Sequence, residues 1–135
     1  MKKFVFDIET NIGFARYYRN IEPHRQIDRW FSTVDSAVYD EDTLRSEFGY
    51  DSAEAIAQSE QYIPFVRVDI LELKKRYLTA FHPELSRKFH YEDFDRDFNI
   101  LIDGINDTRG WHEYEWAELR MAVIQWCKEN GIAYR

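Results

Sequence analysis

Residues 116–132, WAELRMAVIQWCKENGI, decide the fold of this chain. At the helical rotation per residue, the large apolar side chains of this stretch fall within about a third of a turn, which predicts a helix with one strongly apolar face. The face consists of Trp116, Leu119, Val123, Trp126 and Cys127, and Ala117, Met121 and Ile124 form a flanking stripe. We expect this helix to be the central packing element, with its tryptophans, Leu119 and Val123 buried.

The end of this helix is marked by Asn130, Gly131 and Ile132. Gly131 can adopt the left-handed conformation that closes a helix, and Ile132 can then fold back onto the last apolar turn. The stretch therefore predicts both the helix and its C-terminal cap.

Capping residues predict further helices upstream. An N-cap aspartate accepts a hydrogen bond from a backbone N–H near the start of a helix, and an acid three residues later completes a capping box. Asp40, Asp51 and Asp69 are placed in this way, the last two with Glu54 and Glu72 three residues further on.

Other signals mark where helices end and where one more helix lies. Gly49 is expected to end the first capped helix, and Pro83 to stop the helix that Asp69 begins. In residues 91–105 the apolar side chains fall at steps of three and four, which predicts an amphipathic helix. These side chains are Tyr91, Phe94, Phe98, Leu101 and Ile105.

The N-terminal segment shows a different period. Residues 2–8 alternate apolar and polar, residues 9–13 supply turn chemistry, and residues 14–18 can return as a second strand. This pattern predicts a β-hairpin, which the extended residues 63–68 could join. Residues 20–39 show no clear period and predict no element. The fold class is therefore α+β, an N-terminal β-hairpin or small antiparallel sheet packed with about four helices.

Composition indicates one domain that spans residues 1–135. The chain is 44% hydrophobic and 17% aromatic, which is enough to build a core, and only five Gly and three Pro argue against a linker. Cys127 is the lone cysteine, so no internal disulfide is expected, and its place on the apolar face predicts an inert core thiol. The sequence has neither a signal-peptide pattern nor a long apolar run, so we expect a cytoplasmic protein that does not bind membranes.

Charge is distributed unevenly along the chain. The formal net charge is −7, and residues 35–60 hold eight acidic residues against one basic residue, Arg45. Net acidity disfavours binding to a phosphate backbone, which requires Lys and Arg. It can steer a protein toward a basic partner protein. The candidate partner-binding residues are Asp40, Glu41, Asp42, Glu47, Asp51 and Glu54.

A catalytic alternative rests on Asp7 and Glu9, in the stretch FDIET. This stretch resembles the first motif of DEDD-type 3′–5′ exonucleases, in which such acids hold two metal ions that activate water. That chemistry needs two further aspartates on later elements. The simpler interpretation is that both acids flank a hairpin turn and catalyse nothing.

A second alternative concerns residues 14–31. Within residues 14–19, FARYYR, aromatic residues interleave with arginine, as in proteins that bind single-stranded nucleic acid. The simpler interpretation is a β-strand with Tyr and Arg on both faces. No metal or other cofactor is expected, because the four histidines show no zinc-ligand spacing.

Three motifs together resemble a known family. Trp111 and Tyr114, followed by residues 126–132, resemble the ending of the bacterial Uncharacterised Protein Family 0158. Residues 62–65, YIPF, are similar to the middle motif of that family, and residues 5–10, VFDIET, to its N-terminal motif. The resemblance implies an α+β domain of unknown function and assigns no catalytic residue.

We therefore expect a non-enzymatic module that binds a basic partner protein, as an adaptor or inhibitor does. The alternatives are a metal-dependent nuclease or hydrolase that uses Asp7 and Glu9, and a single-stranded nucleic-acid binder that uses residues 14–31. Neither the partner nor the oligomeric state follows from the sequence.

Overall fold

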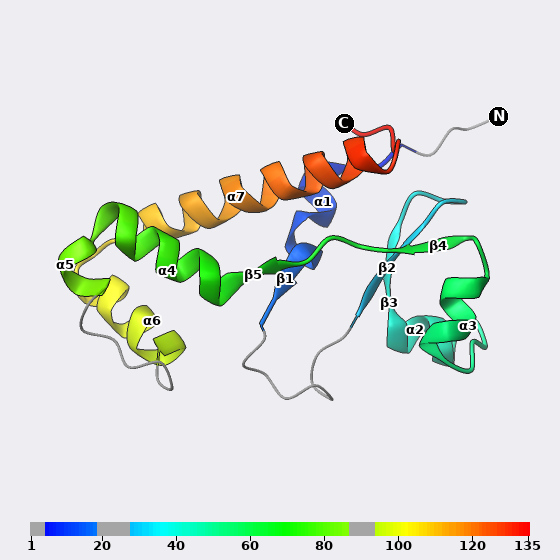
Figure 1. Ribbon diagram of the computed structural model, residues 1–135, viewed down its shortest axis with the longest axis horizontal. Helices are drawn as coiled ribbons and strands as arrows, with labels where there is room; N and C mark the ends of the chain where they lie inside the picture. The colour runs from blue at the N-terminus through cyan, green and yellow to red at the C-terminus, as the bar shows by residue number, and fades with distance from the viewer. Residues whose placement is uncertain (1–4, 19–27, 87–93) are drawn as a thin grey trace.

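The computed structural model describes residues 5–18, 28–86 and 94–135, and its fold is α+β. Helices α4, α5, α6 and part of α7 gather at one end of the molecule, and a three-stranded sheet with two short helices lies at the other (Figure 1). Segments α1 and β1 lie between these two ends, beside α7.

The longest element is α7, Thr108–Glu129, which carries the predicted apolar face. Leu119, Val123 and Cys127 are fully buried and Trp126 nearly so, which confirms the central role of this helix. The prediction was wrong for Trp116, which is only partly buried. In this half of the helix the buried residues are Trp111, Glu115 and Leu119, spaced by four, and Trp116 lies beside that row. Its indole N–H donates a hydrogen bond to Glu9, 3.1 Å away, on α1.

The flanking stripe of α7 was not predicted to be buried, and two of its three residues face solvent. Met121 is 64% exposed and Ala117 is also exposed, whereas Ile124 is half-buried against the core. The cap of the helix is as predicted. Gly131 has a φ of +66°, and the backbone N–H of Ile132 donates to the carbonyl of Cys127 at 2.8 Å.

The predicted N-terminal hairpin is wrong within the described residues. Helix α1, Ile8–Asn11, is followed by a 3₁₀ turn, Ile12–Ala15, and by strand β1, Arg16–Tyr17. Ile8, Ile12 and Ala15 are buried, because their spacing of four and three places them on one face of a helix. Strand β1 pairs in parallel with β5, Val68–Asp69, and not with its own neighbour in sequence.

The antiparallel sheet lies elsewhere in the chain. Strands β2, Arg29–Ser32, β3, Val38–Asp40, and β4, Tyr62–Pro64, form a sheet in the order β3–β2–β4. Two of these strands come from residues 20–39, for which no element was predicted. Residues 63–68 are extended as expected, but they divide their pairing between β2 and β1.

Two short helices lie between β3 and β4 in the chain. Helix α2, Glu41–Ser46, begins at Asp40, whose side chain accepts a hydrogen bond from the N–H of Thr43 at 2.7 Å, as predicted. Helix α3, Ala53–Gln58, is capped by Ser52, which accepts from Ala55 at 3.2 Å. The prediction of Asp51 as this cap was therefore wrong by one residue.

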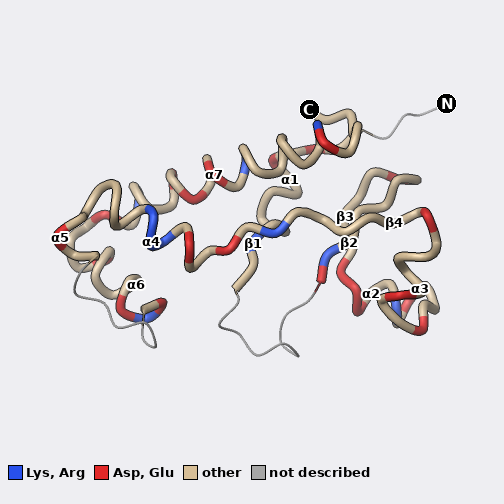
Figure 2. The backbone as a smooth tube through the Cα atoms, in the orientation of Figure 1, with Lys and Arg blue, Asp and Glu red and all other residues tan. Residues whose placement is uncertain are grey.

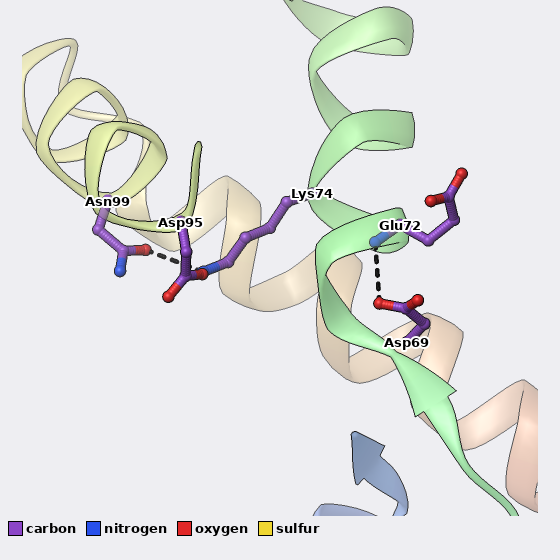
Figure 3. Close-up of polar contacts among 5 residues, drawn as sticks. All are labelled: Asp69, Glu72, Lys74, Asp95 and Asn99. Atoms are coloured by element: carbon purple, nitrogen blue, oxygen red, sulfur yellow. Dashed lines mark hydrogen bonds and ion pairs between the residues drawn. The ribbon is translucent and has the colours of Figure 1, made fainter. Parts of the chain in front are cut away.

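The remaining helices match their predicted positions. Helix α4, Ile70–Phe81, begins at Asp69, whose side chain accepts from the N–H of Glu72 at 3.3 Å (Figure 3). Pro83 ends α4 and also begins a short helix α5, Pro83–Ser86. Helix α6 covers Phe94–Gly104, and the residues expected before it, 91–93, lie outside the described part of the chain.

The buried side chains form two cores. The larger one joins α1, α4, α6 and α7 to β2 through residues such as Phe6, Phe31, Leu78 and Phe98. The smaller one consists of Trp30, Leu44, Ile56 and Tyr62, beneath α2 and α3. Strand β2 contributes Phe31 to the larger core and Trp30 to the smaller one, so the sheet lies between the two cores.

Candidate functional site

Residues 28–64, which we call the acidic lobe, contain the sheet β3–β2–β4 with α2 and α3. Figure 2 shows Asp and Glu concentrated along α2 and α3 at this end of the molecule. The lobe has nine acidic residues and two arginines, a formal charge of −7. The rest of the sequence holds sixteen acidic and sixteen basic residues, so the whole net charge of the chain belongs to this lobe.

The six acids predicted to bind a partner all lie in the acidic lobe, but they are not equivalent. The structure leaves four of them exposed and two half-buried. Asp42, Glu47, Asp51 and Glu54 are exposed, and Asp40 and Glu41 are half-buried at the start of α2. The exposed group is therefore the part that a partner could contact, whereas Asp40 serves the fold as the N-cap.

A shallow depression of about 520 Å³ connects α2 to the segment before α3. Asp42, Arg45, Ser46, Tyr50 and Asp51 line it. The guanidinium of Arg45 donates to the backbone carbonyl of Asp51 at 3.0 Å, so its hydrogen bond goes to the backbone and not to a carboxylate. The acids of the depression therefore keep their charge available to a ligand.

The acidic lobe also exposes an aromatic side chain that the sequence analysis missed. Phe48 is 54% exposed, and its ring contacts that of Tyr39 edge to face at 5.7 Å between centroids. Phe48 lies between Glu47 and Gly49. Its position between a charged residue and a glycine that ends a helix was a sequence signal that the Phe48 ring is exposed. An exposed aromatic ring among acids is typical of a protein-binding surface.

Hydrogen bonding within the acidic lobe is incomplete. The hydroxyl of Tyr39 donates to Asp35, and this bond together with burial raises the pKa of Tyr39 to about 12. Within residues 5–18, 28–86 and 94–135, three buried side-chain atoms find no partner: Trp30 Nε1, Asp35 Oδ1 and Glu41 Oε1. All three belong to the acidic lobe. Such groups each cost roughly 1–3 kcal/mol, so this end of the molecule is the less optimised one.

A second site lies among β1, α4, α6 and α7, and the sequence analysis did not find it. We call it the polar cleft, a cavity of about 440 Å³. Its lining consists of Arg16, Tyr18, Lys74, Asp95, Asn99, Trp111, His112 and Glu115. Two of these residues, Lys74 and Glu115, are charged and buried, with exposures of 4% and 5%.

Lys74 lines the polar cleft and extends from α4 toward Asp95 and Asn99, as Figure 3 shows. Its ammonium group donates to Asp95 and, at 3.3 Å, to Asn99, both on α6. The same group lies 5.2 Å from the centre of the Phe98 ring. These contacts satisfy a buried charge that would otherwise be costly.

Glu115 enters the polar cleft from α7. Its Oε1 atom accepts a hydrogen bond from Arg16 of β1 at 2.8 Å. The sequence carried a signal that went unused, because Glu115 precedes Leu119 by four residues and so lies on the buried face. A charged residue on the buried face of a helix indicates either an internal ion pair or a ligand-binding site.

A longer groove continues from the polar cleft along α7. Its volume is about 1020 Å³, and Trp116, Ala117 and Arg120 form part of its wall. Arg16, His112 and Glu115 line both cavities, so the two adjoin. Arg109 in this groove pairs with Glu113.

The candidate catalytic acids are engaged in local contacts. Glu9 accepts from Arg120 at 2.8 Å and from Trp116, and chiefly the bond from Arg120 lowers the pKa of Glu9. Asp7 accepts from the hydroxyl of Thr10 at 2.9 Å. Among the described residues, no three His, Cys, Asp or Glu side chains come together as metal ligands would. The structure thus does not bring Asp7 and Glu9 into a carboxylate cluster in that part of the chain.

The arginines near the candidate nucleic-acid segment also have internal contacts. Arg16 pairs with Glu115, and Arg29 lies 5.3 Å from the centre of the Phe14 ring. Arg67 lies 5.2 Å from the ring of Tyr17. Residues 19–27 of this candidate lie outside the described part of the chain.

A third polar cluster joins the end of α4 to the start of α7. Asp107 accepts from the hydroxyl of Tyr77 at 2.5 Å and contacts the ring of His82 at 2.7 Å. The bond from Tyr77, and then that from His82, lowers the pKa of Asp107. A Cβ atom on Gly110 would lie 2.8 Å from the Tyr77 hydroxyl, so the cluster requires glycine at that position. These residues act as a structural joint between α4 and α7.

Cys127 lies where the sequence predicted, in the larger core. It is fully buried, and burial raises the pKa of its thiol to about 11. A thiol with this pKa and no exposure is a poor nucleophile at neutral pH.

Comparison with known proteins adds no relative. The chain matches no family model, no curated protein and no solved structure. The resemblance to Uncharacterised Protein Family 0158 stays a prediction. Within the described ranges, no helix combines the length and the apolar character needed to cross a bilayer.

Proposed function

We propose that the protein is a cytoplasmic binding module that docks a basic partner protein through the exposed acids of the acidic lobe. The observation that carries this proposal is the location of the charge: the lobe has a formal charge of −7, and the remainder of the sequence sums to zero. A charge confined to one end of a molecule orients that end toward an oppositely charged partner during diffusion.

The acids and the aromatic ring would have different roles in this interaction. Asp42, Glu47 and Asp51 would steer the partner and set the orientation, because charges at the rim of an interface act mainly on the association rate. Phe48 would supply the apolar contact, since buried aromatic anchors contribute most of the affinity in protein interfaces. The depression lined by Asp42 and Asp51 would receive a Lys or Arg side chain.

The two alternative functions have less support. A metal-dependent nuclease would need Asp7 and Glu9 free to hold metal ions, whereas Glu9 is bound to Arg120 and Trp116. A nucleic-acid binder would need unpaired arginines near residues 14–18, and Arg16 is paired with Glu115.

The proposal is tested by charge reversal in the lobe with a matched control in the body. The lobe variant is Asp42→Lys/Glu47→Lys/Asp51→Lys, and the body variant is Glu84→Lys/Asp103→Lys/Glu129→Lys, which changes exposed acids outside the lobe by the same total charge. A partner is first isolated on immobilised wild-type protein, and its association rate is then measured for all three proteins.

We expect the lobe variant to associate about tenfold or more slowly at low salt, and the body variant to match wild type within about twofold. The wild-type rate should fall as salt rises, because exposed charges are screened over about 8–10 Å at physiological ionic strength. An equal loss in both variants would mean that only total charge matters, and would contradict a docking face on the lobe.

A further inference from the structure

We propose that the polar cleft is a second binding site, separate from the acidic lobe, and that it takes a small zwitterionic molecule with an ammonium group and a carboxylate, of the free amino acid class. Its volume of about 440 Å³ falls in the range of small-ligand pockets, about 300–1,000 Å³. It also lies at a junction of helices, where such pockets commonly occur.

The charges of the cleft select the class of ligand. The lining holds two ion pairs, Arg16 with Glu115 and Lys74 with Asp95, so it is close to neutral and presents both signs of charge. A ligand with a net charge would leave one charge without a counterpart in a partly buried site, which is costly. A zwitterion can place each of its charges beside an opposite one and adds no net charge.

Glu115 is the residue that we assign to the ammonium group. It is buried, it lines the cleft, and it accepts a hydrogen bond from Arg16 at one carboxylate oxygen, Oε1. A carboxylate accepts several hydrogen bonds, so Glu115 can accept from a ligand ammonium group beside its bond from Arg16. The guanidinium of Arg16, beside it, is the group that would bind the ligand carboxylate.

The surroundings of Glu115 favour this assignment. Tyr18 lines the same cavity, and burial together with the nearby charge of Glu115 raises the pKa of its hydroxyl, which therefore remains protonated as a donor. Trp111 forms an apolar wall. The side chain of the bound amino acid would extend into the adjoining groove along α7, toward Trp116 and Ala117.

An internal ion pair alone would not produce this arrangement. A purely structural pair can be packed on all sides, whereas both buried charges here line one cavity and come from different helices. The contacts of Lys74 with Asp95 and Asn99 hold α6 in place, so we assign Lys74 to positioning the wall of the cleft.

The experiment uses a pool of the common protein amino acids at about 10 mM, observed by ligand-detected NMR with the full-length protein. The amino acid that binds most tightly is then compared with two analogues, its N-acetyl derivative, which lacks the ammonium, and its amide, which lacks the carboxylate. We expect each analogue to bind about tenfold more weakly or worse, because each leaves one buried charge unpaired.

Variants then locate the site. Glu115→Gln should weaken binding by about tenfold or more, and Glu129→Gln, on the same helix but in the lining of neither cavity, should leave it within about twofold. Tyr18→Phe, which removes only a hydroxyl, is the second probe if the Glu115 variant does not fold, and should weaken binding by several-fold. Failure of every amino acid in the pool to bind, or analogues that bind as tightly as the parent, would overturn the proposal. Failure of this test leaves the acidic lobe untouched, because the two sites share no residue.

Discussion

The acidic lobe and the helical body use charged residues in opposite ways. In the body, ion pairs connect elements: Arg16 with Glu115 joins β1 to α7, and Arg120 with Glu9 joins α7 to α1. In the lobe, the acids outnumber the arginines by nine to two, and four of the six candidate acids are exposed. Charges in the body therefore hold the fold together, whereas those in the lobe face solvent.

The two regions also differ in packing. The larger core extends through the body, and among the described residues it includes eight buried aromatic side chains. These are Phe6, Phe31, Phe65, Tyr77, Phe94, Phe98, Trp111 and Trp126. The lobe core consists of four buried residues, and the lobe contains the buried polar atoms that lack partners among the described residues. Stability should accordingly depend on the body, and substitutions on the lobe surface should affect binding.

The largest effect is expected for Trp126→Ala. The Trp126 ring contacts Phe31 and Phe65 at 5.3 and 4.9 Å between centroids, and its N–H donates to Pro64 at 3.2 Å. Removal of this side chain should lower the free energy of unfolding by about 3–5 kcal/mol, measured by chemical denaturation. Trp116→Ala is the control at a partly buried position of the same helix. Equal losses in the two variants would contradict the assignment of Trp126 as the centre of the core.

A smaller effect is expected for Gly110→Ala, which tests the joint between α4 and α7. The added Cβ would lie 2.3 Å from Asp107 and 2.8 Å from the Tyr77 hydroxyl. The forced shift should cost about 1–3 kcal/mol in denaturation experiments. Gly104→Ala is the matched control, since nothing lies within 4 Å of its added Cβ. A Gly110→Ala protein as stable as the control would mean that the joint is looser than described.

The same joint should make stability depend on acid pH. The pKa of Asp107 in the folded protein is below its ordinary value of 3.8, so its contribution is complete above that value and is lost as pH falls through the folded pKa. Asp107→Asn should therefore lower the melting temperature at pH 7 and reduce its fall between about pH 4 and pH 2. Parallel pH profiles for wild type and variant would rule out this role for Asp107.

The C-terminal helix could be predicted because its signals are local. The apolar spacing from Leu119 to Cys127 and the cap at Gly131 lie within a single stretch of chain, and both were confirmed. The error at Trp116 concerns the first half of the helix, where the buried row consists of Trp111, Glu115 and Leu119 and Trp116 lies beside it. Periodicity alone cannot supply that information.

The N-terminal segment and the sheet could not be predicted for different reasons. Ile8 and Ile12 fit both an alternating and a helical pattern, and the choice is made by distant residues, since Phe6 bridges to Tyr134 near the C-terminus. Strand β2 buries Trp30, Phe31 and Ser32 in succession, so the alternation that marks a strand is absent.

The two candidate sites show the same limit. The acidic lobe could be predicted, because its residues are close together in sequence and their composition is biased. The polar cleft could not, since Arg16, Lys74, Asp95 and Glu115 come from four separate elements. Only the position of Glu115 on an apolar helical face pointed to it.

The central claim is that the exposed acids of the lobe serve binding and not the fold, and the melting temperature of Asp42→Lys/Glu47→Lys/Asp51→Lys tests it most directly. Asp42 lies in the first turn of α2 and Glu47 at its end, so reversal should lose a helix-dipole interaction at one end and gain one at the other, about 0.3–1 kcal/mol each. The three substitutions also relieve repulsion among the remaining acids, which raises the stability of the lobe. We predict a melting temperature within about 2 °C of wild type, or above it at low salt. A fall of about 10 °C would contradict the claim, because it would show that these acids stabilise the lobe.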